Sequence, residues 1–391
     1  MRLLQFFRSP TFALFSISAW VISFLVIAGS QAHNNVGYLI LFIPVLLSLQ
    51  LKEINKLLEH PLAKMLVVVI FSLILSACIG DGSPWKQAKF GAVVLLFYLA
   101  VARLPLLLDE TVYKAAWALL GLLITYVIFN AILQYAQGSW TLGSRLGELY
   151  AKLENVIYVT NTMGGMMAII TFLGMRAKRY REVLIAHILV LFFSLTILQT
   201  RSIIGIWALI TLLASLSLYR QGLFNRKLMV SLISVGLVFI MMIIGLIFFS
   251  SIGDSLLTRK FYRFEIWDGF IAETLRCGVW LGCGPEHKFT FITQDQVDIL
   301  HSHSAFVTQF YKAGIVGFIP LVTLTVWAII RGLQEKSWAA WYFMVGALGL
   351  CFDGSSLFHS TSQRWLVFHL PLALLIAQEL HSPSKLAKTA T

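Results

Sequence analysis

Two histidines flank a hydroxyl in His301-Ser302-His303, at the end of the longest polar stretch of the chain and just before a new apolar run. A neutral imidazole near pH 7 can take a proton from a hydroxyl group, so this segment could supply a general base. Two histidines this close could instead be half of a metal site. The residues that could complete it are Glu286, His287, Asp295 and Asp298. Because nothing in their spacing fixes a ligand set, we expect chemistry without a metal.

Two arginines outside this segment have the chemistry of an anion site. Arg201 lies between two long apolar runs, where an arginine is costly unless it has a partner. Arg263 and Trp267 are four residues apart, so on a helix they share one face. A guanidinium is a rigid fork of donors that matches phosphate oxygens and keeps its charge. Each of these cations also has an interpretation without a functional role. Arg201 could extend its charged end to the membrane surface, and the cations near residue 260 could contact lipid headgroups.

A short polar stretch near the C-terminus, residues 353–364, contains Asp353, His359 and Arg364. It could approach the long polar stretch described above, but its spacing does not distinguish it from an ordinary polar turn. Arg364 is retained as a candidate for the site. The sequence has no nucleophile elbow, no phosphate-binding glycine loop and no group of carboxylates that would bind Mg²⁺, so no cofactor is expected.

The composition identifies the elements that must position these residues. Only 12% of the 391 residues are charged, 58% are hydrophobic, and the mean hydropathy is +0.82. Soluble proteins carry about 25% charged residues, which excludes a large soluble enzyme. We expect an all-α polytopic membrane protein with about twelve transmembrane helices, because a span must satisfy its own backbone hydrogen bonds in lipid. The apolar runs are 11–28, 36–51, 63–80, 88–102, 112–136, 155–175, 183–200, 202–219, 228–250, 304–330, 338–352 and 365–380.

Positive charge is distributed unevenly over the segments that join these runs. With the N-terminus inside, the inner segments carry a net charge of +11 and the outer segments +1, out of a total of +12. This pattern places both termini in the cytoplasm. The net positive charge therefore indicates the orientation of the chain in the membrane and contact with anionic lipid. It does not indicate a nucleic-acid partner. The outer segments are 29–35, 81–87, 137–154, 251–303 and 353–364.

One outer segment is far longer than the others and divides the chain. We expect nine spans in 1–250, a large outer loop in 251–303, three spans in 304–380 and a cytoplasmic tail in 381–391. Within the loop, residues 256–275 predict an amphipathic helix that lies along the headgroups, and the glycines from Gly278 onward end it. Cys277 and Cys283 could form a disulfide in an oxidising compartment or could be two independent small residues.

This pattern resembles the O-antigen ligase family, a bacterial membrane superfamily that includes ligases, related polymerases and some protein O-oligosaccharyltransferases. The resemblance covers the architecture of the whole chain, with twelve spans and a large loop between spans nine and ten. Its motifs are His303-Ser304-x9-Gly314-x2-Gly317 after the loop, Arg201-Ser202 after the seventh run and Arg263-x3-Trp267 early in the loop. In this setting Gly314 and Gly317 would allow close helix packing beneath the histidines.

The resemblance implies a GT-C-type glycosyltransferase in the bacterial inner membrane, with its site facing the periplasm. The donor would be a glycan on undecaprenyl pyrophosphate, and the acceptor a sugar hydroxyl on lipid A-core. The reaction would be inverting and independent of metal. By the motif match, His303 would be the general base, and Arg201 and Arg263 would hold the pyrophosphate. Further candidates for the site are His301, Trp267 and Arg364.

Two kinds of alternative stay open. A polymerase or a protein O-oligosaccharyltransferase of the same superfamily would use the same donor and a different acceptor. A transporter of lipid-linked glycans would also explain many spans and an arginine between apolar runs. A transporter, however, predicts charged or broken helices at the middle of the membrane, whereas nearly all charges here lie between the apolar runs.

Overall fold

The computed structural model describes residues 2–220, 262–293, 296 and 298–381 of the chain. The predicted ninth span, 228–250, lies outside the described residues, as do the first part of the large loop and nearly all of the tail. The chain divides into two compact units. The first unit comprises residues 1–108, 151–153 and 262–391, and the second comprises 109–150 and 154–261.

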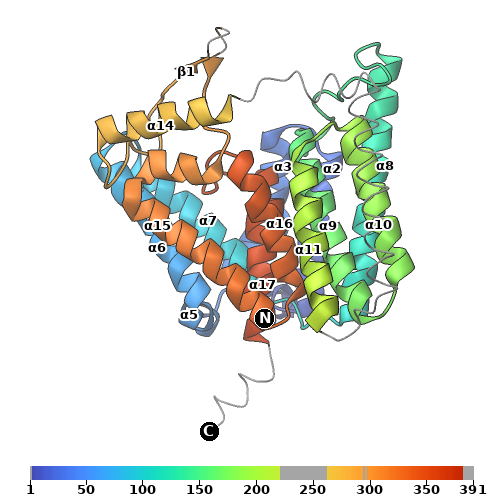
Figure 1. Ribbon diagram of the computed structural model, residues 1–391. Helices are drawn as coiled ribbons and strands as arrows, with labels where there is room; N and C mark the ends of the chain where they lie inside the picture. Colours follow the sequence, from blue (N-terminus) through green and yellow to red (C-terminus); the bar gives the residue numbers. More distant parts are fainter. Residues whose placement is uncertain (1, 221–261, 294–295, 297, 382–391) are drawn as a thin grey trace. The chain divides into compact units, whose positions relative to one another are not determined.

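Nearly all regular structure in the described part of the chain is helical (Figure 1). The first unit contains α1 (Arg2–Phe7), α2 (Pro10–Val26), α3 (Ser30–Gly37), the π-helix η1 (Tyr38–Phe42), α4 (Ile43–Leu47), α5 (Leu51–Glu59), α6 (Pro61–Ile79), α7 (Pro84–Ala102), α14 (Arg263–Cys277), α15 (Ala305–Gln334), α16 (Trp338–Phe352), the π-helix η3 (Trp365–His369) and α17 (Leu370–Leu380). The second unit contains α8 (Asp109–Ala136), α9 (Val156–Arg176), α10 (Tyr180–Phe192), the π-helix η2 (Phe193–Ile197) and α11 (Ser202–Arg220). One small exception to the predicted all-α chain is the antiparallel pair of β1 (Phe291–Ile292) and β2 (Asp298–Ile299) in the large loop.

The helices are those of a membrane-embedded protein. Among the described residues, six helices are long and apolar enough to cross a membrane: α6, α7, α8, α9, α10 with η2, and α15. The continuous stretch α3–η1–α4 joins α5 at a bend of 102° and counts as a seventh if the bent pair is one span. Shorter apolar helices lie at Pro10–Val26, Ser202–Ser217, Trp338–Phe352 and Trp365–Leu380. Helices thus occupy eleven of the twelve predicted runs, and the number of true spans stays a prediction.

Local sequence explains where several helices begin. A serine hydroxyl accepts a hydrogen bond from a backbone N–H of the first turn at α2, α7, α15 and α16, which satisfies a donor that the helix leaves unpaired. The four capping serines are Ser9, Ser83, Ser304 and Ser337. Proline stands in the first turn of α2, α6 and α7, where its missing N–H costs nothing.

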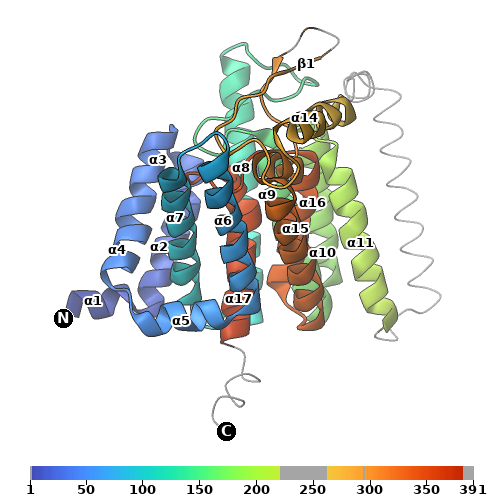
Figure 2. The same ribbon diagram turned by 90° about the vertical axis from the view of Figure 1, so that its left-hand side faces the viewer.

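Contacts within the first unit agree with the predicted alternation of sides. The segments predicted on the outer face meet one another: Asp81 contacts His287, Lys86 contacts Glu286, Thr361 contacts Asn34, and Lys152 contacts Ser30. The segments predicted on the inner face meet in the same way: Arg8 contacts Ser48, Arg103 contacts Glu53, and Glu379 contacts both His60 and Arg331. Figure 2 shows α5 and α14 lying across opposite ends of the long helices of this unit. The contacts therefore support two distinct faces of this unit.

The helix α15 is broken at Gly314, where φ is 56° and ψ is −157°. Residues 305–313, here called the short arm, precede the break, and residues 315–334, the long arm, follow it. Figure 1 shows the two arms running in different directions. The prediction that Gly314 serves helix packing was wrong in its detail, because this glycine supplies a left-handed backbone conformation that other residues rarely adopt. Gly317 does pack closely, since a Cβ there would lie 3.0 Å from Ser72 Oγ on α6.

A loop of the large outer segment fills the break. Residues 278–286, here called the inserted loop, follow α14, and a disulfide between Cys277 and Cys283 closes their first part. This answers the question that the sequence left open about these cysteines. A Cβ at Gly314 would lie 2.4 Å from the carbonyl of Trp280, and a Cβ at Gly282 would lie 2.6 Å from Tyr311 O. Only glycines therefore allow the two backbones to come this close.

The inserted loop satisfies the backbone groups that the break exposes. Cys283 N donates to Tyr311 O at 2.9 Å and Gly284 N donates to Lys312 O at 3.2 Å. Beyond the break, Ile315 N and Val316 N donate to carbonyls of the loop at 2.9 and 3.1 Å. Because an unpaired backbone group costs several kcal/mol in lipid, these bonds are what permit a broken helix here.

The end of α6 holds the other side of the inserted loop. Ser76 Oγ lies 2.7 Å from Leu281 O and 2.6 Å from Lys312 O, so it bridges the loop and the short arm. Asp81 pairs with the loop through its backbone: its N–H donates to Cys283 O at 3.0 Å, and its carbonyl accepts from Glu286 N at 2.9 Å. The loop is therefore bonded on two sides by backbone groups from segments far apart in the sequence.

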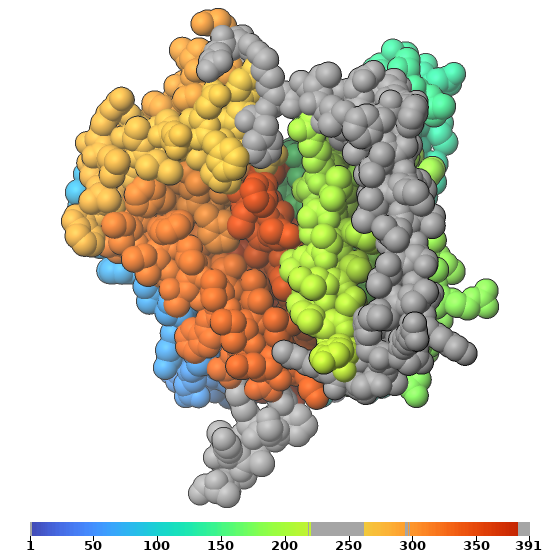
Figure 3. Space-filling model, in the orientation of Figure 1, coloured from blue at the N-terminus to red at the C-terminus, as the bar shows by residue number. Residues whose placement is uncertain are grey.

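The helix α14 packs on the short arm of α15 through one face. Ile266 and Phe270 are 4% and 2% exposed and form a cluster with Cys283 and Tyr311. Phe264, in contrast, is 60% exposed and lies outside this buried face. Figure 3 shows α14, in gold, lying directly over the orange surface of α15. Burying two such side chains contributes about 3–6 kcal/mol to holding the arm and the helix together.

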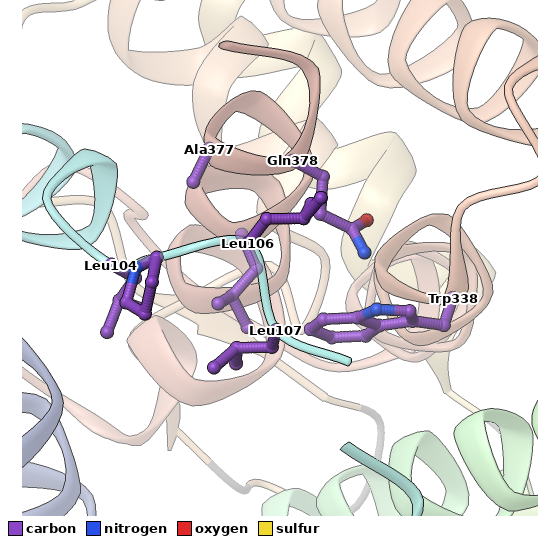
Figure 4. A pocket seen from close by; sticks show the side chains of 8 residues that line it. Leu104, Leu106, Leu107, Trp338, Ala377 and Gln378 are labelled. Atoms are coloured by element: carbon purple, nitrogen blue, oxygen red, sulfur yellow. The ribbon is translucent and has the colours of Figure 1, made fainter. Parts of the chain in front are cut away.

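A small apolar cavity lies between the stretch after α7 and the helices α16 and α17 (Figure 4). Its lining residues are Leu104, Pro105, Leu106, Leu107, Trp338, Leu374, Ala377 and Gln378. Its volume of about 10 Å³ has room for one water molecule and no more. The cavity lies among segments of the predicted inner face, so it has no part in a site on the outer face.

Replacing Gly314 with alanine tests the role of the break. Gly314→Ala places a Cβ against the carbonyl of Trp280 and forces a left-handed conformation on a residue with a side chain. We expect the free energy of unfolding to fall by about 2–5 kcal/mol, from the backbone conformation and the displaced loop together. The measurement is the unfolding midpoint of the purified protein in detergent.

Gly205→Ala in α11 is the matched control, since a Cβ there meets no atom within 4 Å. It is expected to be neutral or to stabilise the helix by about 0.5–1 kcal/mol. Equal midpoints for the two variants would show that the inserted loop does not depend on glycine at the break.

Candidate functional site

His303 stands in a strained backbone conformation at the start of the short arm. Its φ is 51°, a region that residues with a Cβ rarely occupy and that costs about 1–3 kcal/mol. The neighbours hold it there: Ser304 caps α15, and the buried Ser302 Oγ donates to Ser304 O at 2.8 Å and lies 2.9 Å from Thr308 Oγ1. Trp267 Nε1 fixes the same segment by donating to Ser302 O at 2.9 Å. Residues that precede and follow His303 in the sequence thus hold its backbone in this conformation.

A carboxylate orients the imidazole of His303. Its Nδ1 lies 3.3 Å from Oδ1 of Asp353, whose side chain is 9% exposed, while the His303 side chain is 31% exposed. A carboxylate only accepts hydrogen bonds, so Nδ1 carries the proton and Nε2 keeps its lone pair. A histidine in this tautomer is set up to receive a proton at Nε2, as a general base must be.

The loop of residues 353–364 brings Asp353 to this place. Asp353 follows the last residue of α16, and its N–H donates to Gly349 O at 2.9 Å. Gly354 lies against the start of α15, where a Cβ would be 3.2 Å from Ala305 N. The sequence predicted that this loop could approach the large outer loop, but it gave no reason to pair Asp353 with His303, because 50 residues separate them.

His301 lies beside His303, with ring centroids 4.1 Å apart and the rings edge to face. Desolvation at this position and then the positive charge of a protonated His303 lower the pKa of His301, with Arg364 adding to the effect and Asp353 opposing it. His301 is therefore neutral near pH 7. Its contact with His303 makes it a neighbour of the base, as the sequence predicted, without a partner that would give it a separate role.

The helix α14 carries Trp267 and Arg263 to the same region. Trp267 stacks on Phe352, the last residue of α16, with centroids 6.1 Å apart, and it also holds the Ser302 carbonyl. Arg263 is the first residue of α14 and precedes Trp267 by four positions, about one helical turn. The prediction that the two share a helix face is therefore confirmed, and Trp267 links that face to the histidine segment.

Arg201 belongs to the second unit, where it precedes the first turn of α11. Arg201 is exposed. The two residues before it are held by hydrogen bonds of their side chains. Gln199 has a φ of 46° and donates from its side chain to Gly143 O at 2.8 Å, while Thr200 Oγ1 lies 2.8 Å from Thr160 Oγ1. The first unit thus contains the other predicted site residues, namely His301, His303, Arg263, Trp267 and Arg364.

Arg364 ends the 353–364 loop and is bonded to hydroxyl groups. Its Nη1 donates to Ser355 Oγ, and its Nε donates to Ser362 Oγ at 3.2 Å. No acid within the described ranges forms an ion pair with it. Its full positive charge is therefore left beside the histidines, close enough to affect the pKa of His301.

One group of metal-type ligands occurs in the part of the chain that the structure describes. It consists of Cys277, Cys283 and His287, whose ligand atoms lie within 4.8 Å of one another. The two sulfur atoms are bonded to each other, so they offer no thiolate to a metal. The alternative in which His287 and Asp298 complete a site with His301 and His303 receives no support from this grouping, and Asp295 lies outside the described residues.

Another histidine, His287, directly follows the inserted loop and contacts two acids. Its Nδ1 lies 2.5 Å from Asp81 Oδ2, and its Nε2 lies 3.4 Å from Glu273 Oε1. The hydrogen bond to Asp81 raises the pKa of His287, partial burial opposes that rise, and Glu273 adds to it. The protonated imidazole can bond both carboxylates at once, which ties α14 to the end of α6.

No protein-family model matches the chain, and no curated protein matches it either. The function is therefore inferred from the geometry of the residues and from the resemblance of the motifs.

The contact between His287 and the two acids predicts a dependence of stability on pH. A pKa that is raised in the folded state adds stability that is fully present below the unfolded value of about 6.5 and is lost as the pH rises through the folded value. We expect His287→Gln to lower the unfolding midpoint most at pH 6 and progressively less toward pH 9. The measurement is the difference between the midpoints of the native protein and the variant across that range. A difference that stays constant with pH would contradict the role of the charged imidazole.

Proposed function

We propose that this protein is an O-antigen ligase. It would transfer O-antigen polysaccharide from undecaprenyl pyrophosphate to a sugar hydroxyl of lipid A-core, on the periplasmic face of the bacterial inner membrane. The observation that carries the proposal is the pairing of His303 with Asp353, which leaves Nε2 of the histidine as a proton acceptor. The twelve spans, the GT-C-type fold and the cytoplasmic position of both termini belong to the same proposal.

The proposed reaction uses a base and fixed cations. Nε2 of His303 takes the proton of the acceptor hydroxyl, and the oxygen forms a bond to C1 of the donor sugar. The bond between C1 and the pyrophosphate oxygen breaks, so undecaprenyl pyrophosphate leaves with the electron pair and the configuration at C1 inverts. Arg201 and Arg263 stabilise the charge that develops on the leaving group. General-base assistance of this kind contributes about 10²–10⁴-fold to the rate.

Three features of the first unit support this mechanism. The backbone strain at His303 lies where a functional residue would be, since strain persists only when the surrounding structure imposes it. Arg263 lies one turn from Trp267, which is itself bonded to the histidine segment. Arg364 adds a cation without an acid partner among the described residues. A site with fixed cations beside a base can activate a pyrophosphate leaving group.

The proposal is tested with purified protein, a glycan on undecaprenyl pyrophosphate and lipid A-core. We expect glycosylated lipid A-core to form in the presence of EDTA. His303→Ala should lower the rate by about 10²–10⁴-fold, because the acceptor hydroxyl loses its base. His381→Ala serves as the matched control, since that histidine bonds Ala102 O on the opposite side of the unit. Full activity of His303→Ala would contradict the proposal, and loss of activity in EDTA would require a metal in the mechanism.

The orientation of the base gives a second prediction. Asp353→Asn leaves a side chain of the same shape that no longer fixes the proton on Nδ1, so we expect the turnover to fall by about 10²–10⁴-fold. Asp268→Asn, an exposed acid on α14, should retain the native rate. Equal rates for the two variants would show that Asp353 does not position the base.

The arginines are tested in the same assay. Arg201→Ala and Arg263→Ala are expected to be inactive and the lysine variants partly active, because lysine keeps the charge and loses the fork of donors. Arg276→Ala, on the exposed side of α14, is the control. Elongation of the lipid-linked glycan without transfer to lipid A-core would identify a polymerase in place of a ligase.

A further inference from the structure

Cys277, Cys283 and His287 together have the ligand chemistry of a zinc site. Cys277 is the last residue of α14, Cys283 lies in the inserted loop, and His287 directly follows that loop. One ligand atom from each of the three residues lies within 4.8 Å of those of the other two. Zn²⁺ prefers thiolate and imidazole ligands, usually four of them in a tetrahedron. The disulfide is what keeps this group from offering thiolates to a metal.

Glu273 is in position to supply a fourth ligand. It lies one helical turn before Cys277 on α14, so the two side chains share a face of the helix. Its backbone carbonyl lies 3.6 Å from Cys283 Sγ, and its Oε1 lies 3.4 Å from His287 Nε2. Arg276 pairs with the other carboxylate oxygen, Oε2, at 3.1 Å. Two sulfur atoms, one nitrogen and one oxygen can therefore meet around one ion.

Asp81 orients the histidine of this group. Its Oδ2 lies 2.5 Å from His287 Nδ1, and a carboxylate only accepts hydrogen bonds, so Nδ1 donates a proton to it. The other ring nitrogen, Nε2, is directed toward Glu273. A histidine that binds a metal typically donates its second N–H to a carboxylate in this way, which fixes the ring. His287 is therefore oriented as a metal ligand by a contact that does not involve the cysteines.

Backbone hydrogen bonds hold the group together independently of the disulfide. Cys283 N donates to Tyr311 O at 2.9 Å, and the Tyr311 hydroxyl donates to His287 O at 3.3 Å. Gly282 N donates to Gly278 O at 2.8 Å, directly after α14. Opening the S–S bond therefore leaves the two sulfur atoms close to each other. A tetrahedral zinc ion would hold them about 4 Å apart, because its bonds to sulfur are about 2.3 Å long.

We infer that the reduced form of this protein binds one Zn²⁺ ion through Cys277, Cys283, His287 and Glu273. A dithiol reductant opens the disulfide: it supplies two electrons and two protons, becomes a cyclic disulfide and leaves two thiols on the protein. Zn²⁺ then displaces the two thiol protons and binds both thiolates. Cys277 is exposed, so the reductant and the ion can reach the group from its side. The inference is independent of the proposed function.

Zinc would take over the role of the disulfide under reducing conditions. The S–S bond closes the first part of the inserted loop, whose backbone fills the break in α15. An ion bound to the same two sulfur atoms would join α14 to the loop at the same points and add His287 to the cross-link. Because such an ion binds the folded protein and not the unfolded chain, it would stabilise the reduced form.

The site is tested with the full chain, purified in detergent and reduced with dithiothreitol, which is then removed without air. Zn²⁺ is added, the unbound ion is removed, and the bound metal is measured by elemental analysis. We expect about one zinc ion per reduced chain and none in the oxidised chain. Zinc should also raise the unfolding midpoint of the reduced chain and leave that of the oxidised chain unchanged. Co²⁺ in place of zinc should give the charge-transfer absorption of a thiolate-bound ion.

Variants assign the ligands. Cys283→Ser and His287→Gln should each weaken zinc binding by about tenfold or more, and Asp81→Asn by about 10–100-fold through the orientation of the histidine. The control is the double variant Cys78→Ser with Cys351→Ser, which removes the two free cysteines of the chain and should bind zinc as the native chain does.

Three results would overturn the inference. They are no zinc in the reduced native chain, equal zinc in the oxidised chain, and loss of binding in a control variant that keeps the native unfolding midpoint. If Cys283→Ser does not fold, the cobalt spectrum of the reduced native chain decides, since a spectrum without thiolate absorption would exclude the two cysteines as ligands.

Discussion

The structure of the first unit depends on the break in α15 and on the backbone that fills it. A helix within a membrane normally satisfies every N–H and carbonyl within itself, and the cost of leaving one unpaired is several kcal/mol. At Gly314 the non-helical backbone interrupts that internal pairing. The inserted loop replaces it with bonds to Tyr311, Lys312 and the first residues of the long arm. The loop and the break are therefore stable only together, and the glycines at both places make the close approach possible.

The candidate site follows from this arrangement. The short arm runs in its own direction because of the break, and its first turn carries His303, capped by Ser304. The disulfide and the contacts of Phe270 with Tyr311 fix α14 on the same arm, which is how Trp267 reaches the carbonyl of Ser302. The strain at His303 is thus supported by packing and hydrogen bonds that lie one or two turns away. A site built on fixed elements keeps its charges oriented before the substrate arrives, which is the source of most electrostatic catalysis.

Much of the arrangement could be predicted from the sequence. The apolar runs indicate the helices, and the distribution of charged residues indicates which segments share a face of the membrane. Eleven of the apolar runs contain helices, and the contacts in the first unit agree with the predicted faces. The break at Gly314 could not be predicted, since a glycine in an apolar run is equally typical of close helix packing. Asp353 was recognisable as a polar residue in a loop, but its pairing with His303 depends on tertiary structure.

The distribution of charge explains how such a site could work with fixed cations. A pyrophosphate leaving group needs positive charge close to its oxygens at the moment the bond breaks. Arginines held by hydroxyls or by a helix terminus present that charge without the freedom of a mobile ion, and Arg364 is held in this way by Ser355 and Ser362. The base is oriented by its own carboxylate, Asp353, which lies at Nδ1 of His303 and leaves Nε2 free. In the proposed mechanism, anion binding and proton removal fall to different side chains, so each can be changed by substitution without removing the other.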